Sequence, residues 1–211
     1  MMTHGLTLYA DSHFTSPYVM SVFVTLTEKD IPFQIKTVDL DSDENKAEPY
    51  ARLSLTRRVP TMAHGDFHLS ESSAISEYLE EVFPVPLHAP VYPREPGQRA
   101  VARQVQAWLR SDLSPIREER STQSIFFNKP IDRPLTAQAR ASADKLIAVA
   151  SELVRDGTGH LFGHWCIADT DLALMLNRLI MNGDAVPSSL KAYAERQWQR
   201  ASVQQWVKRA R

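Results

Sequence analysis

The sequence contains a single cysteine, Cys166, among 211 residues. One cysteine cannot build a disulfide framework within a chain, and neither a Cys-x-x-Cys pair nor a Cys/His zinc spacing is present. This composition is typical of proteins that fold in a reducing compartment. His13, His64 and His68 do not share one face of a helix, so we interpret them as surface residues and predict no metal site.

Long hydrophobic runs are missing as well. No stretch of the sequence approaches the ~18 apolar residues that a membrane-spanning helix needs. The opening residues MMTHGLTLYADSH lack the basic region and the apolar run of a secretory signal peptide. We therefore expect a soluble, cytoplasmic protein with no membrane partner.

An excess of one charge is the third feature that the sequence lacks. Its 24 Lys and Arg residues against 25 Asp and Glu residues leave a formal net charge of −1. Without a basic surplus, nothing indicates a nucleic acid as a partner. The hydrophobic content of 43% is ordinary for a globular protein, and the length allows one large or two small domains.

The first part of the chain alternates between strand-like and helix-like patterns. Apolar runs predict strands over 6–10 and 33–40. Between them, Ser16 suits a helix N-cap and Pro17 suits the first helical position. The apolar side chains that follow share one helical face: Val19, Val22, Phe23 and Leu26. This β–α–β run indicates two parallel strands joined by a crossover helix.

Residues 41–83 complete the predicted first domain. The charged stretch 41–58 has little periodicity, and we interpret it as a short helix within a loop. Gly65-Asp66 is typical of a hairpin turn between strands at 61–64 and 67–69. The stretch 70–83 has the apolar period of a helix. The predicted order of elements is therefore β–α–β–α–β–β–α.

Five prolines follow between Phe83 and Gly97, a density that neither a helix nor a central strand tolerates. We predict a proline-rich linker over 85–97, between a first domain at 1–84 and a second at 98–211. Every periodic stretch after the linker is helical. The predicted fold class is an α/β domain followed by an all-α domain.

Three motifs stand in this frame. Val59-Pro60 precedes the third predicted strand, ESSAI at 71–75 opens the helix that follows the hairpin, and GHWCIAD at 163–169 precedes the most apolar helix. In this order and spacing the chain resembles the cytosolic glutathione transferases, which implies a thioredoxin-like first domain and an all-helical second domain. The runs SPYVMSVFVTLTEK, TRRVP and WCIADTDLALMLNRL are most similar to the bacterial YfcF-type transferases.

The resemblance implies a site for glutathione as cosubstrate. It implies that Pro60 is cis and that Val59 offers its backbone N–H and C=O to the cysteinyl part of glutathione. A trans proline that begins an edge strand is the alternative. It also implies that Glu71 and Ser72 bind the γ-glutamyl end, since a helix N-terminus suits a carboxylate. The alternative is that 70–73 only caps a helix.

Ser16 is the candidate catalytic residue, because related classes carry a serine or a cysteine at this place. Its hydroxyl and the helix N-terminus would stabilise the glutathione thiolate, whereas a free thiol has a pKa of ~8.5. The alternative is an N-cap without chemistry. Ser12, Tyr9 and Tyr18 are other candidates, of which Tyr9 fits the core better.

The implied activity is attack of the thiolate on small electrophiles, together with glutathione-dependent reduction of organic hydroperoxides. A serine cannot form the mixed disulfide that a cysteine at position 16 would permit, which disfavours thiol transfer. A catalytically silent binding or regulatory protein with the same fold is the competing hypothesis. The resemblance also implies a homodimer.

The remaining candidates lie away from these motifs. Lys46 is the predicted ligand of the glycine carboxylate of glutathione, with Arg58 as the alternative, although each also fits a solvated surface charge. Phe14 and Trp108 are predicted walls of an electrophile pocket between the domains, and Trp108 equally fits core packing.

Asp169 is predicted to be a structural cap at the start of the most apolar helix. The family has a serine or threonine three residues earlier, where this chain has Cys166. A thiol is a weak donor, so Asp169 should bond mainly to backbone N–H groups. Cys166 itself is predicted to be a buried, inert thiol.

Overall fold

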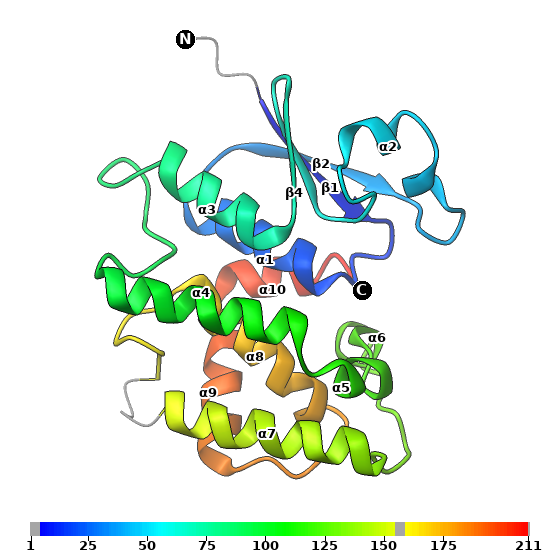
Figure 1. Cartoon of the computed structure of the whole chain (residues 1–211), viewed down its shortest axis with the longest axis vertical. Helices are drawn as coiled ribbons and strands as arrows, with labels where there is room; N and C mark the ends of the chain where they lie inside the picture. The colour runs from blue at the N-terminus through cyan, green and yellow to red at the C-terminus, as the bar shows by residue number, and fades with distance from the viewer. Residues whose placement is uncertain (1–4, 155–158, 211) are drawn as a thin grey trace. The chain divides into compact units, whose positions relative to one another are not determined.

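The computed structural model describes residues 5–154 and 159–210, which divide into two compact units between Val91 and Tyr92 (Figure 1). The division between the units falls inside the range predicted for the linker. Residues 1–4 and 211, at the outer ends of the two predicted domains, lie outside the described residues.

The first unit contains a four-stranded mixed sheet in the order β2-β1-β3-β4. Strand β1 (Leu6–Asp11) pairs in parallel with β2 (Phe33–Val38) and antiparallel with β3 (Thr61–His64), which pairs antiparallel with β4 (Phe67–Ser70). Gly65 takes a φ of 61° in the tight turn between β3 and β4, as the predicted hairpin requires.

Helices α1 (Pro17–Glu28) and α3 (Ser72–Val82) pack against each other and against the sheet (Figure 1). Helix α1 is buried on almost every side, so polar groups within it need partners. The Thr25 and Ser76 hydroxyls meet at 3.0 Å between α1 and α3, and both side chains are fully buried. This pair joins the two helices inside the core.

The segment between β2 and β3 contains a 3₁₀ turn, η1 (Glu44–Lys46), and a short helix, α2 (Tyr50–Leu53). Its charged and weakly periodic sequence places few side chains in the core, and Tyr50 is the buried residue of α2. The order β–α–β–α–β–β–α is confirmed, with η1 as an addition.

The second unit is helical, and residues 92–154 and 159–210 contain no strand. Helix α8 is buried along nearly its whole length, which confirms the prediction from its apolar sequence. The helices of this unit are α4 (Pro96–Ser111), α5 (Ser114–Glu119), α6 (Thr122–Phe126), α7 (Ala137–Leu153), α8 (Ile167–Ile180), α9 (Ser188–Trp198) and α10 (Ala201–Val207).

Helix α4 begins at Pro96, inside the range predicted for the linker. The carboxylate of Glu95 accepts hydrogen bonds from the N–H groups of Gly97 and Gln98 at 2.8 and 2.6 Å, and these bonds lower its pKa. Proline density marks the connection, but an acidic N-cap followed by proline is itself a helix start.

The fold class is confirmed: a thioredoxin-like α/β domain precedes an all-α domain. Among the described residues, the longest apolar helical stretches fall short of what crossing a membrane requires.

Candidate functional site

The register of the sheet brings three chain segments to one edge. Asp11 at the end of β1 stands opposite Val38 at the end of β2. Thr61 at the start of β3 stands opposite Ser70 at the end of β4. Because β1 and β3 are antiparallel, with Tyr9 opposite Thr61, these ends meet at the same edge. The segments leading to α1, into β3 and into α3 therefore converge there.

Ser16 is the N-cap of α1, as predicted. Its Oγ accepts a hydrogen bond from the N–H of Val19 at 3.3 Å, and Pro17 occupies the first turn. Within the described chain, the hydroxyl proton of Ser16 has no acceptor. A hydroxyl that accepts from a helix N-terminus can still donate its own proton. The two alternatives for Ser16, N-cap and thiolate donor, are therefore compatible.

A buried carboxylate that the sequence reasoning missed holds Ser16 in place. Asp11 is 4% exposed, and its carboxylate accepts from the N–H and hydroxyl of Thr15 at 2.7 and 3.1 Å and from the N–H of Ser16 at 3.1 Å. An aspartate before a Thr-Ser-Pro helix start was the available signal, since short acidic side chains bond nearby backbone N–H groups.

The Val59–Pro60 peptide bond is cis. Pairing of β3 begins at Thr61, so Val59 and Pro60 lie just beyond the end of both ladders. This is the arrangement that the resemblance implies for a backbone that pairs with a peptide-like ligand.

Glu71 has an unusual backbone conformation at the start of α3. Its φ of 73° and ψ of 114° lie outside the regions that non-glycine residues commonly adopt. The Glu71 side chain makes no capping hydrogen bond, and Ser72, the first residue of α3, is 3% exposed. The positive end of α3 is therefore not neutralised by its N-cap side chain.

Lys46 and Arg58 differ in their partners. The Lys46 ammonium pairs with Asp43 at 2.7 Å, and both side chains are more than 60% exposed. The guanidinium of Arg58 is exposed and has no hydrogen-bond or ionic partner in the part of the chain that the structure describes. A ligand carboxylate would have to displace Asp43 in order to bind Lys46. It could bind Arg58 without displacing another group.

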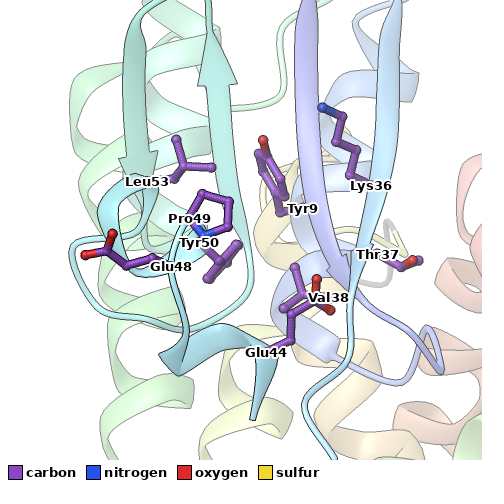
Figure 2. Close-up of a pocket in the computed structure, with 9 residues that line it drawn as sticks. All are labelled: Tyr9, Lys36, Thr37, Val38, Glu44, Glu48, Pro49, Tyr50 and Leu53. Atoms are coloured by element: carbon purple, nitrogen blue, oxygen red, sulfur yellow. The ribbon is translucent and has the colours of Figure 1, made fainter. Parts of the chain in front are cut away.

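A pocket of about 290 Å³ lies between the segment η1–α2 and the strands β1 and β2. Figure 2 shows Lys36 and Tyr9 at one end and Glu44 at the other. Tyr9 thus faces a pocket and is half-buried, which corrects its interpretation as a core residue; its position on β1, outside the alternating set Leu6, Leu8 and Ala10, explains this. The residues that line the pocket are Tyr9, Lys36, Thr37, Val38, Glu44, Glu48, Pro49, Tyr50 and Leu53.

The other two predicted pocket residues lie in different units. Phe14 is half-buried and has a φ of 55° in the loop before α1. Trp108 is half-buried on α4, and its Nε1–H donates to the Asp112 carboxylate at 3.1 Å. Neither residue is fully packed into a core, and each could contact a ligand from within its own unit.

Asp169 is fully buried at the start of α8 and accepts three hydrogen bonds. The donors are the N–H groups of Cys166 and Leu161 at 2.9 and 2.8 Å and the Tyr193 hydroxyl at 2.8 Å. Burial raises the pKa of Asp169 and raises that of the Cys166 thiol well above its usual range. The raised pKa and the burial of Cys166 both disfavour the thiolate, the form in which a cysteine reacts. In the described ranges 5–154 and 159–210, His, Cys, Asp and Glu side chains form no group able to hold a metal ion.

Two family models match this chain. The glutathione S-transferase N-terminal domain matches residues 15–82, and the glutathione S-transferase C-terminal domain matches residues 95–210. The chain therefore belongs to the glutathione S-transferase family of enzymes.

Individual relatives agree with this assignment. Glutathione S-transferase theta-3 of Mus musculus is 29% identical over 170 residues, which cover 78% of this chain and 69% of the relative. Glutathione S-transferase theta-1 of Homo sapiens is 28% identical over 152 residues, covering 72% of this chain and 62% of the relative. The chain thus spans about two thirds of the length of these curated relatives.

Solved structures match over the whole chain. A glutathione transferase homologue from Burkholderia gl BGR1 with bound glutathione is 46% identical, with a TM-score of 0.80 and coverage of 98% of this chain and 97% of the other. A diazinon-metabolizing glutathione S-transferase from Bombyx mori has a TM-score of 0.81 at 20% identity, with coverage of 98% and 96%, a likeness of fold alone.

Proposed function

We propose that this chain binds glutathione along the sheet edge where β1 and β4 end and β3 begins, and that Ser16 stabilises the glutathione thiolate. Val59 binds the cysteinyl part through its backbone, next to cis-Pro60, and Glu71 with Ser72 binds the γ-glutamyl end. The observation that carries this proposal is the convergence of these segments at one edge, set by the strand register. The glutathione bound to the Burkholderia homologue supports the choice of ligand.

Electrostatics supports the same orientation. The N-terminus of α3, which the Glu71 side chain does not cap, carries a partial positive charge that suits the γ-glutamyl carboxylate, and the Glu71 carboxylate can accept from the ammonium. At the other end, the glycine carboxylate is bound by Lys46 or Arg58. Between them, the hydroxyl proton of Ser16 is free to donate to the sulfur.

The activated thiolate attacks small electrophiles and reduces organic hydroperoxides. Phe14 and Trp108 contact the electrophile, and Asp169 acts as a structural cap. We further propose a YfcF-type transferase, on the three sequence runs quoted above, that works in the cytoplasm as a homodimer without a metal. The domain boundaries 1–84 and 98–211, with the linker between them, belong to the same proposal.

The test is calorimetric titration with glutathione, followed by measurement of the thiolate absorbance of the complex against pH, for wild type and Ser16→Ala. We expect glutathione to bind and its thiol to titrate well below ~8.5 in wild type but not in the variant. A screen of electrophiles and hydroperoxides then separates conjugation from peroxide reduction. Absence of binding at millimolar glutathione would favour the catalytically silent alternative.

A further inference from the structure

Four hydroxyl side chains form a buried cluster between α2 and the ends of β3 and β4. Tyr50 is 4% exposed, Ser54 1%, Thr61 0% and Ser70 7%. The Tyr50 hydroxyl lies 3.0 Å from Thr61 Oγ1, which lies 3.2 Å from Ser70 Oγ, which lies 3.1 Å from Ser54 Oγ. We call these four residues the hydroxyl cluster.

The hydroxyl cluster converges on one backbone carbonyl, that of Arg58. The Tyr50 hydroxyl donates to it at 2.8 Å, and the Thr61 and Ser54 hydroxyls lie at 3.2 and 3.3 Å. If Tyr50 and Thr61 donate to the carbonyl, Ser70 can donate to Thr61 and Ser54 to Ser70. Every hydroxyl proton then has an acceptor, and both lone pairs of the carbonyl are used. Burial raises the pKa of Tyr50, so it stays a donor at neutral pH.

This carbonyl controls the orientation of the next amide. The C=O of Arg58 and the N–H of Val59 belong to one planar trans peptide group and point in opposite directions. Holding the carbonyl therefore fixes where the Val59 N–H points. Residues 57–60 have no strand pairing, and Arg57 has a φ of 53°. Side chains therefore hold the Arg58 carbonyl in place. The Asn45 amide likewise donates to the Arg57 carbonyl at 2.8 Å.

The same cluster reaches the second binding segment. Ser70 is the last residue of β4 and directly precedes Glu71 and Ser72. Its hydroxyl bonds to Thr61 and Ser54, so the start of α3 and the Val59–Pro60 step are tied to one set of buried donors and acceptors. Tyr50 also lines the pocket of Figure 2, while its hydroxyl bonds to the Arg58 carbonyl and to Thr61.

We propose that Tyr50, Ser54, Thr61 and Ser70 are positioning residues for glutathione: the hydroxyl cluster aims the Val59 N–H at the cysteinyl carbonyl and sets its spacing from Glu71 and Ser72. This inference rests on the proposed function, since it concerns the same ligand. It separates two properties of the site. The cluster governs the affinity for glutathione, whereas Ser16, on α1, governs the ionisation of the thiol.

The test uses Tyr50→Phe, which removes the hydroxyl and keeps the ring that packs edge-on against Tyr9 at 5.6 Å. Thr61→Val removes a second hydroxyl, and Thr61→Ser retains it as a rescue. Thr25→Val is the matched control, because it breaks the equally buried Thr25–Ser76 hydroxyl pair away from the sheet edge. For each variant, the dissociation constant for glutathione, the pH titration of the bound thiol and the thermal midpoint are measured.

We expect Tyr50→Phe and Thr61→Val to weaken glutathione binding about five- to ten-fold, with the thiol titrating as in wild type. Thr61→Ser should bind glutathione like wild type. Thr25→Val should also bind it like wild type, even if its thermal midpoint falls as far as that of Tyr50→Phe or Thr61→Val. If Thr61→Val does not fold, Tyr50→Phe decides. Equal affinity in Tyr50→Phe and Thr25→Val would overturn the inference alone, and absence of binding by wild type would overturn the proposed function with it.

Discussion

The two roles of Ser16 can be separated by replacing it with aspartate and with alanine. Aspartate is as good an N-cap as serine, so Ser16→Asp keeps an acceptor for the N–H of Val19. At neutral pH, however, a carboxylate has no proton to donate and adds a charge of the same sign as the thiolate. Ser16→Ala removes both the cap and the donor.

The geometry of Ser16 sets the expected changes in the free energy of unfolding and in the pKa of the bound thiol. The capping bond is long, at 3.3 Å, so Ser16→Ala should lower the free energy of unfolding by only about 0.5–1 kcal/mol, and Ser16→Asp by less. A hydrogen bond to a charged group contributes about 1.5–3 kcal/mol. Its loss should raise the pKa of the bound thiol by about one to two units. If the thiol returns to its free pKa of ~8.5, the thiolate fraction at pH 7 falls roughly eight- to twenty-five-fold.

The assay pairs thermal unfolding with the rate of glutathione conjugation to an aromatic chloride between pH 6 and pH 10. Ser16→Asp should unfold like wild type yet conjugate slowly at neutral pH. Ser16→Ala should also be slow at neutral pH and recover much of its rate above about pH 9, because the thiol then ionises without help. The reasoning is refuted if Ser16→Asp has both the stability and the thiol pKa of wild type, since Ser16 would then be a cap only.

Three other perturbations test separate parts of the structure. Asp169→Ala should lower the free energy of unfolding by about 3–5 kcal/mol and the thermal midpoint by about 10 °C, because it leaves two buried donors and one half-buried donor without an acceptor; a shift under about 2 °C would contradict the assignment as a structural cap. The hydrogen bond from Lys145 lowers the pKa of Asp112 to about 2. The stabilisation of the folded state by the ionised Asp112 is therefore fully present above about pH 4 and is lost as the pH falls toward 2. In Lys145→Ala, thermal midpoints measured from pH 2 to pH 5 should therefore decline less steeply than in wild type. Arg58→Ala should weaken glutathione binding more than Lys46→Ala in calorimetry, since Lys46 is already paired with Asp43, and the reverse order would identify Lys46 as the carboxylate ligand.

Much of the fold could be predicted because its signals are local. The N-cap Ser16 and Pro17, the turn at Gly65 and the apolar period of α8 each depend on residues close together in the sequence. Proline density extended the predicted linker to residue 97, although Glu95 and Pro96 carry a local signal for the start of α4.

The interpretation of Tyr9 failed for a different reason. Alternation along β1 places Leu6, Leu8 and Ala10 in the core, and Tyr9 on the other side of the strand. Whether that side is packed or open depends on what covers it. Here η1 and α2 leave a pocket, and neither has a strong periodic pattern in the sequence.

The order of elements, the helix start at Ser16 and the motifs around Val59 and Glu71 could all be predicted from the sequence, because each is encoded by neighbouring residues. The meeting of these motifs at one edge could not be predicted in this way, since it follows from the pairing of β1 with β3 and of β3 with β4 in the folded chain. It also revealed Asp11 and the hydroxyl cluster. Their hydrogen bonds depend on distances and burial that arise only when the chain has folded, and serine, threonine and tyrosine are too common for their identity alone to predict them.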